Sequence, residues 1–303
     1  MFTSKVKWFS GYSVVLVVML AVSACSGGAN VENGSSSVSQ EPKPYNVEHI
    51  QKDDAVAALL PDSIIEKGTI ETGTEAGYAP AEFVDDNDNI IGFDVDLSNA
   101  IGKVLGVNFN WHSASFDSLI ASLGTKYDIA FASMFVTPER LKEADFITYD
   151  KVGSNVVVQK GNPKGISLAD FCGITVAVQK GTQEADDAES YSAACKSDGK
   201  SPIEVLIHDA QTVATNDVIT GKADATFATQ IVGDYAVKIT GDQLESLGIY
   251  NDPYDIGIAV KKSDSIENAL QQAIQKLIDT GEYQKIVDNW GLGSGIAASE
   301  ILK

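Results

Sequence analysis

Residues 91–111 read IGFDVDLSNAIGKVLGVNFNW, and the order of apolar positions in this stretch decides the fold class. Asp94 is placed to cap a helix, and Gly106 is placed to end it. Between them the apolar residues recur at helical spacing, at Leu97, Ala100, Ile101, Val104 and Leu105. Val107, Phe109 and Trp111 then alternate as in a strand. A helix followed at once by a strand is typical of an α/β fold.

The same pattern continues on both sides of this stretch. Short runs typical of strands lie at residues 68–72, 128–133, 155–159, 174–179, 203–207 and 223–227. Helical spacing occurs at residues 55–60, 116–123 and 266–278, and helices are also expected after Thr182 and Ala210. This alternation predicts mostly parallel sheets covered by helices, in two sheets of about five strands rather than one sheet of about ten.

The first residues read as an export signal, with Lys5 and Lys7 before an apolar run at 14–24 that is too short to span a bilayer. The run ends in Val22-Ser23-Ala24-Cys25, which resembles the lipobox of bacterial lipoproteins. Residues 1–24 are then a signal peptide, Cys25 is lipidated (palmitate), and residues 25–47 form a flexible tether. An ordinary cleaved signal with an incidental cysteine is the alternative.

The charge balance restricts the partners. The formal net charge is -20, which repels phosphate backbones and anionic lipid surfaces. Nucleic-acid binding is therefore not expected, and membrane attachment has to come from the lipid. The hydrophobic content of 44% suits a globular core.

Cys172 and Cys195 remain as a pair in an exported chain, and we expect a disulfide between them. Closing a loop of that size contributes roughly 3 kcal/mol in the chain-entropy model. Two free buried thiols are the alternative. A metal site is less favoured, because no histidine lies near either cysteine in the sequence.

Six blocks along the chain resemble the family 3 solute-binding proteins of bacterial ABC importers, whose members include histidine, lysine/arginine/ornithine and glutamine binders. The blocks are Tyr78-Ala79-Pro80; residues 91–97; Thr137-Pro138-Glu139-Arg140 with Asp145-Phe146; Lys180-Gly181-Thr182; residues 221–225; and residues 281–291. The resemblance covers about residues 59–291, and its strength lies in the order of the blocks.

The resemblance implies a periplasmic-binding-protein-like α/β fold with two lobes, each built on a mixed or mostly parallel sheet, joined by a two-segment hinge and with a ligand cleft between them. The first lobe is discontinuous, at 48–152 plus 256–303, and the second spans 153–255. Ligands of such proteins bind between the lobes, which close by hinge bending. Domain interfaces are also where α/β proteins commonly bind ligands.

Two half-sites are implied for an anionic group. In the family, the arginine that matches Arg140 binds the ligand's α-carboxylate, and its planar guanidinium suits that bidentate task. Thr137 should cap a helix that begins at Pro138 and holds this arginine. In the second lobe, the amides of Thr182, Gln183 and the following residue can point at the same anion. The alternatives are a surface arginine paired with Glu139 or Glu143, and a plain helix cap.

Three more residues match ligand-contacting positions of the family. Tyr78 and Phe116 match residues that pack against the ligand's carbon skeleton, with core packing as the alternative. Glu75 matches an acidic position that contacts side-chain nitrogens in binders of basic amino acids and glutamine. A solvated loop residue is the alternative for Glu75.

The chain departs from the family pattern at two positions. Where the family has an aspartate that neutralises the ligand's ammonium, this chain has Thr229, so either Glu75 supplies that charge or the ligand lacks an α-ammonium. Where the family has Ser or Thr, this chain has Phe135, although Ser133 fits nearby. Together with Tyr78 and Phe116, Phe135 could form an aromatic wall suited to an aromatic or cationic group.

The sequence thus predicts the substrate-binding component of an ABC importer, lipid-anchored outside the cytoplasm, which delivers a small polar solute, expected to be an amino acid, to a permease and ATPase. A monomer without cofactor or metal is expected. One alternative is a binding protein for a sensory system. Another is an enzyme like cyclohexadienyl dehydratase, for which Glu75 and Glu184 are available acids, but no GxSxG or HExxH motif supports an enzyme.

Overall fold

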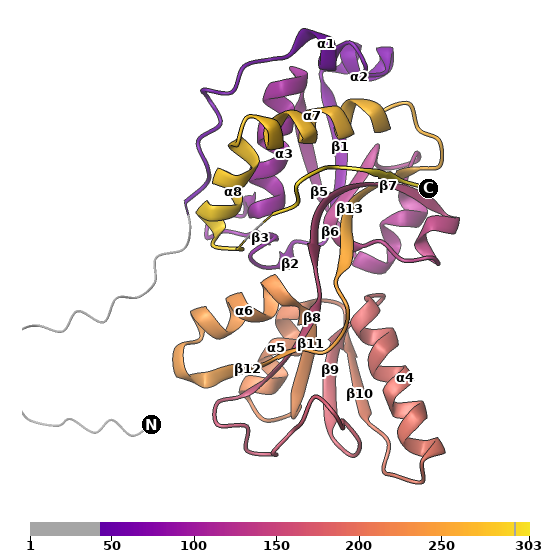
Figure 1. The fold of residues 1–303 in the computed structure, drawn as a ribbon, viewed down its shortest axis with the longest axis vertical. Coiled ribbons are helices and arrows are strands. Elements are labelled where there is room, and N and C mark those ends of the chain that lie inside the picture. The colour runs from indigo at the N-terminus through magenta and orange to yellow at the C-terminus, as the bar shows by residue number, and fades with distance from the viewer. Residues whose placement is uncertain (1–42, 294) are drawn as a thin grey trace, which may run out of the picture. The chain divides into compact units, whose positions relative to one another are not determined.

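The structure is a computed structural model that describes residues 43–293 and 295–303. These described residues form one compact unit, and Figure 1 shows its two layered α/β lobes. The predicted signal peptide, Cys25 and most of the tether lie outside the described residues. Residues at the end of the expected tether pack on the first lobe, since the Tyr45 amide donates to Asp96 Oδ2 over 2.8 Å and Val47 is buried.

The first lobe is built on a mixed six-stranded sheet in the order β14-β7-β13-β6-β1-β5. β1, β5 and β6 are parallel, whereas β13 runs antiparallel to both β6 and β7. A small three-stranded antiparallel sheet, β2-β3-β4, adjoins it. The strands are β1 (Thr69–Thr74), β2 (Gly77–Tyr78), β3 (Glu82–Val84), β4 (Ile90–Ile91), β5 (Asn108–Ser113), β6 (Ile129–Phe135), β7 (Ala144–Val152), β13 (Tyr254–Lys261) and β14 (Ile301–Leu302).

The helices of the first lobe are α1 (Asp54–Ala57), α2 (Asp62–Lys67), α3 (Phe93–Leu105), α7 (Glu267–Asp279) and α8 (Glu282–Trp290). Short 3-10 turns lie at η1 (Phe116–Ser118), η2 (Ile120–Ser122) and η3 (Arg140–Lys142). Apolar residues of α3, α7 and α8 form one core with the sheet, including Leu97, Ile101 and Ile274. Residues of the 3-10 turns pack in a second core with Ala130 and Phe146. The sheet is therefore covered on both faces.

The second lobe has a mixed five-stranded sheet in the order β10-β9-β11-β8-β12. Its strands are β8 (Ser154–Gln159), β9 (Thr175–Gln179), β10 (Glu204–His208), β11 (Ala225–Thr229) and β12 (Leu244–Ile249). Its helices are α4 (Gln183–Ser197), α5 (Gln211–Ile219) and α6 (Gln230–Ile239), and η4 (Gly241–Gln243) is a 3-10 turn. α4 packs in one apolar cluster with the sheet, whereas α5 and α6 pack in another.

Two chain segments join the lobes side by side (Figure 1). The first passes from β7 through Gly153 into β8, and the second returns from β12 into β13. Val152 pairs with Tyr254 in the register of β7 and β13, so the two segments leave the first lobe together. The Cys172–Cys195 disulfide, with a Cα–Cα distance of 5.6 Å, links the segment before β9 to the last turn of α4.

Four local expectations need correction. Asp94 is not the helix cap: Gly92 precedes the first turn of α3, and the Asp94 side chain is buried, where Oδ2 accepts hydrogen bonds from the Ser133 amide and the Tyr149 hydroxyl. Residues 116–123 form two 3-10 turns, which still place Leu119 and Leu123 in the core. The helix at 55–60 is confined to Asp54–Ala57.

The fourth correction concerns the residues after Pro138, which form the short η3 turn rather than an α-helix. Thr137 nevertheless caps this turn, because its hydroxyl accepts from the Arg140 amide at 3.3 Å. The tight turn therefore still fixes the backbone of Arg140.

Candidate functional site

The predicted ligand-contacting residues converge on one small cavity between the lobes. It is lined by Tyr78, Phe116, Ser133, Phe135, Arg140, Thr182, Gln183, Glu184 and Thr229. Glu75 is the one predicted ligand residue outside it. The cavity volume is about 10 Å³, which is the room that a single water requires. The lobes are therefore closed on each other in this arrangement.

Strand ends and turns supply these side chains. Ser133 and Phe135 lie at the end of β6, and Thr229 lies at the end of β11, directly before α6. Thr182 caps α4: its hydroxyl accepts from the Ala185 amide over 3.2 Å and donates to the Gln179 carbonyl over 2.8 Å. Strand ends and a helix N-terminus thus meet at the cavity, as is common for ligand sites in α/β folds.

The guanidinium of Arg140 joins the two lobes. Nη1 donates to the Phe135 carbonyl at 2.6 Å within the first lobe, and Nη2 donates to the Gly181 carbonyl of the second lobe at 2.9 Å. The guanidinium carbon also lies 5.3 Å from the centre of the Phe116 ring, which is a cation–π distance. Burial lowers the pKa of Arg140, but a guanidinium remains charged at any physiological pH.

The lobes approach each other closely at Gly181. Its φ of +77° favours glycine, and a Cβ built on it would lie 2.7 Å from the Asp117 Cβ of the first lobe. The neighbouring Lys180 forms an ion pair of 2.7 Å with Asp117 across the same gap. A side chain at position 181 would therefore hold the lobes apart.

A chain of hydroxyls crosses the cavity and ends on Glu184. The Tyr78 and Thr229 hydroxyl oxygens are 2.7 Å apart, and Thr229 donates to Glu184 Oε1 over 3.2 Å. The Ser154 hydroxyl donates to the same oxygen over 2.7 Å. Burial raises the pKa of the Glu184 carboxyl above its ordinary value. Thr229 therefore lies in the cavity beside the carboxyl group of Glu184, which α4 supplies.

Glu75 lies in a wider, open pocket next to the cavity. Its Oε2 accepts from Gln179 Nε2 at 2.8 Å, which is a contact between the lobes. Burial raises the pKa of Glu75 above its ordinary value. The pocket is lined by Glu75, Ser113, Ala114, Ser115, Asp117, Ser118, Lys180, Asp209 and Ala210. Its carboxyl groups outnumber its one lysine, so the local charge is negative.

Ser133 is held in place from behind. It adopts a φ of +47°, which is uncommon for a residue other than glycine, and its amide donates to Asp94 Oδ2 at 2.9 Å. Burial and the neighbouring Asp94 carboxyl raise the pKa of Glu82 strongly, and burial raises the pKa of Asp94 to about 7.

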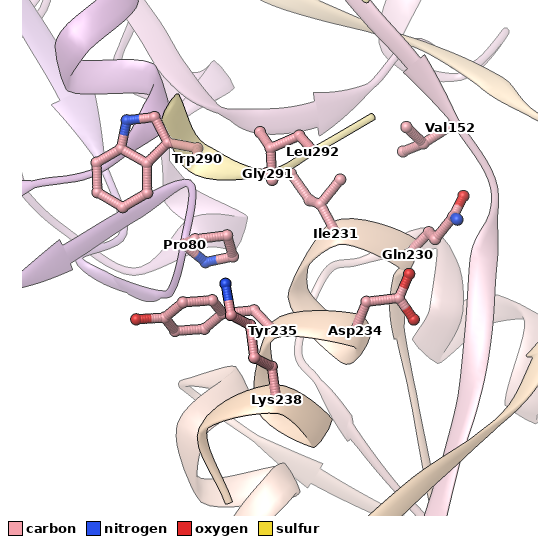
Figure 2. A pocket seen from close by; sticks show the side chains of 10 residues that line it. All are labelled: Pro80, Val152, Gln230, Ile231, Asp234, Tyr235, Lys238, Trp290, Gly291 and Leu292. Carbon is pink, nitrogen blue, oxygen red and sulfur yellow. The ribbon is translucent and has the colours of Figure 1, made fainter. Parts of the chain in front are cut away.

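A second interlobe pocket, of about 120 Å³, lies at the crossing segments (Figure 2). The first lobe contributes Pro80, Val152, Trp290, Gly291 and Leu292, and α6 contributes Gln230, Ile231, Asp234, Tyr235 and Lys238. No sequence pattern predicted this pocket. It forms only where the helix that ends at Trp290 meets α6, two segments far apart in the chain.

Sequence reasoning also missed the roles of Glu184 and Asp94. Glu184 was expected only through its backbone amide, or as an available acid of an enzyme, whereas its side chain lines the cavity. Its position two residues after the cap Thr182 was the available signal, since a first-turn side chain can turn back toward the helix end. Asp94 is buried and supports Ser133 rather than capping α3.

Among the described residues, no helix has the length and apolar character needed to cross a bilayer. Within residues 43–293 and 295–303, one group with metal-ligand spacing occurs, formed by Asp170, Cys172 and Cys195. Both of its cysteines are disulfide-bonded, so neither offers a thiolate.

Residues 70–293 match the family model of the bacterial extracellular solute-binding proteins, family 3. The chain is similar to the arginine-binding protein ArgT of Corynebacterium glutamicum, with 30% identity over 94% of this chain and 92% of the relative. A solved ancestral arginine-binding protein bound to arginine superposes with a TM-score of 0.66 and 32% identity, covering 74% of this chain and 98% of that one.

An ancestral amino acid-binding protein, described as a precursor of cyclohexadienyl dehydratase, is also similar in structure. Its TM-score is 0.68 at 29% identity, covering 77% of this chain and 99% of the other. The predicted fold, two α/β lobes like those of periplasmic binding proteins, is therefore confirmed.

Proposed function

The chain belongs to the bacterial extracellular solute-binding proteins of family 3, and we propose that it binds an amino acid between its lobes and delivers it to an ABC importer. In this role Arg140 binds the α-carboxylate from the first lobe, and the amides of the turn at Thr182 bind it from the second. Tyr78, Phe116 and Phe135 contact the remainder of the ligand.

One observation carries the proposal: Arg140 reaches across the cavity and donates to the Gly181 carbonyl, directly before Thr182 and the first turn of α4. A carboxylate placed between guanidinium and turn would replace this contact with charged hydrogen bonds on both sides. Such bonds are roughly twice as strong as neutral ones. Because both half-sites reach one ligand only when the lobes are closed, binding favours closure.

The small size of the cavity adds an opening step to ligand binding. Ligand sites in proteins enclose roughly 300–1,000 Å³, whereas this cavity measures about 10 Å³. The lobes therefore have to open before a ligand enters, and Arg140 has to leave the Gly181 carbonyl of the second lobe. Opening breaks the Tyr78–Thr229 and Gln179–Glu75 hydrogen bonds between the lobes as well.

The test is a thermal-shift screen of the twenty amino acids, followed by calorimetry on those that raise the melting temperature. Arg140→Ala should weaken the selected ligand at least about 30-fold, as expected when one member of a buried charge pair is removed. Lys142→Ala is the matched control, because it removes an exposed cation from the same turn. A stable Arg140→Ala protein with unchanged affinity would contradict the proposed role of Arg140.

We also propose that Cys25 carries the lipid that anchors the protein outside the cytoplasm, and that the protein acts as a monomer. The family model supports the extracellular location, and the Cys25 block at the end of an export signal supports the anchor. In cells fed labelled palmitate, the wild-type protein should take up label in the membrane fraction. A Cys25→Ser protein that stays membrane-bound would argue against the anchor.

The proposed role is binding without turnover. The family and the arginine-binding relatives support it, and the Glu75 and Glu184 carboxyls already have hydrogen-bond partners from protein side chains. Purified protein incubated with prephenate or arogenate should leave both substrates unchanged. Catalytic consumption of either one would favour the enzyme instead.

A further inference from the structure

The cavity contains two opposite charges that do not pair with each other. In the described part of the chain, the hydrogen bonds of the Arg140 guanidinium end on the Phe135 and Gly181 carbonyls, and no carboxylate lies within ion-pair distance of it. Glu184 lines the same cavity and is only 3% exposed. The two groups attract each other at longer range. A gap between a fixed cation and a fixed anion is complementary to a zwitterion.

The surroundings of Glu184 leave its charge largely uncompensated. Its side-chain partners are the hydroxyls of Ser154 and Thr229, and both donate to Oε1. Thr229 has a single hydroxyl proton, so while it donates to Glu184, Tyr78 has to be the donor in the Tyr78–Thr229 contact. These neutral donors orient the carboxylate, but they do not offset the cost of burying a charge. Neither hydroxyl engages Oε2.

We propose that Glu184 binds the ligand's α-ammonium and thereby supplies the negative charge that Thr229 lacks. This inference rests on the proposed function, and it names the ligand class: a zwitterionic α-amino acid, with its carboxylate on Arg140 and its ammonium on Glu184. Thr229 keeps a role as the donor that aims the carboxylate. Glu184 comes from the first turn of α4, whereas Thr229 ends β11, so the charge is supplied from a different element of the same lobe.

Glu75 is less suited to the α-ammonium. It lines the outer pocket and not the cavity that contains Arg140, and its Oε2 is bonded to Gln179. Its position beside Asp117 and Asp209 suits the far end of a long or cationic ligand side chain. The two acids are thus assigned to different ends of the ligand, and this makes them separable by experiment.

The experiment compares each amino acid with its des-amino analogue. The probes are L-arginine with 5-guanidinopentanoate and L-glutamine with glutaramate, measured by calorimetry on the full mature chain. The wild-type protein should prefer the amino acid. Glu184→Gln should lose at least about 30-fold in affinity for the amino acid and less than about threefold for the analogue. Glu189→Gln, which removes an exposed charge from the same helix, is the control and should change neither affinity.

A rescue separates a charge role from a structural one. Adding Thr229→Asp to Glu184→Gln should restore most of the preference for the amino acid. If Glu184→Gln does not fold, Glu184→Asp keeps the charge while withdrawing it by one methylene, and it should weaken the amino acid more than the analogue.

The outcomes distinguish the two proposals. Wild-type protein that binds none of the twenty amino acids overturns the proposed function and this inference with it. Amino-acid binding in which the Glu184 variants lose both members of a probe pair equally, or neither, overturns the inference alone.

Discussion

Removing the Cys172–Cys195 disulfide should destabilise the protein without changing its ligand site. The two cysteines are 23 residues apart in sequence. For a loop of that length the chain-entropy model gives about 3.4 kcal/mol at 25 °C, which acts by restricting the unfolded chain. In a protein of this size such a loss lowers the melting temperature by about 7–14 °C.

The ligand site should be spared for a geometric reason. Cys195 lies in α4 eleven residues beyond Glu184, or about 16 Å along the helix axis. The cavity end of α4 is held independently by the Thr182 cap and by the hydroxyls on Glu184. An effect confined to the unfolded state changes the free energy of unfolding and leaves affinity within about threefold.

The assay is urea unfolding of the Cys172→Ala, Cys195→Ala double variant, with calorimetry of ligand binding at low urea. Wild-type protein treated with a thiol reductant provides a control that creates no cavity at the cysteines. A loss of stability below about 1 kcal/mol in both samples would refute the loop-closure reasoning. A large loss of affinity in the folded variant would show instead that the disulfide shapes the native lobe.

Two further predictions concern the first lobe. Gly92→Ala should cost at least about 2 kcal/mol in the free energy of unfolding, because φ is +142° and the new Cβ would clash with the Ala81 carbonyl oxygen. A urea midpoint within error of wild type would contradict this. Burial raises the pKa of Asp96 from 3.8 to about 6, so its contribution to stability is fully present below about pH 4 and is lost as pH rises through 6, a change of about 3 kcal/mol. Asp96→Asn keeps an oxygen acceptor for the Tyr45 and Trp290 N–H groups. The variant should lose the part of the fall in urea midpoint between pH 4 and 7 that comes from Asp96. A pH dependence equal to that of the wild type would show that other groups cause the fall.

Periodic segments were predictable from sequence because their pattern is local. The helix expected at 266–278 is observed as Glu267–Asp279, and the strand expected at 155–159 as Ser154–Gln159. The error at Asp94 has a tertiary cause: the residue resembles a cap by position, but a partner 55 residues away, Tyr149, holds its carboxyl in the core. Propensity at a helix end is small compared with the cost of leaving such buried donors unpaired.

In the candidate site, too, local motifs were predictable from sequence and tertiary contacts were not. Apart from Glu184, the residues that line the cavity could be named in advance because ordered motifs placed them, but their hydrogen-bond partners could not. The Tyr78–Thr229 contact joins residues 151 apart, and Thr229 meets Glu184 across 45 residues. Loss of an expected aspartate at one strand end is visible in sequence. Its replacement by an acid from a neighbouring helix is visible only where the two elements pack.

Charge placement of this kind also bears on specificity. A carboxylate on α4 approaches the cavity from the helix N-terminus, where the turn amides that would bind the ligand carboxylate also lie. The carboxylate and the ammonium of one zwitterionic ligand would then both contact the N-terminus of α4. Arg140 is the charged residue that the first lobe contributes to the cavity. Closure would depend on a single guanidinium bridging to that helix end. A ligand without a carboxylate would consequently bind the second lobe and fail to draw the first lobe onto it.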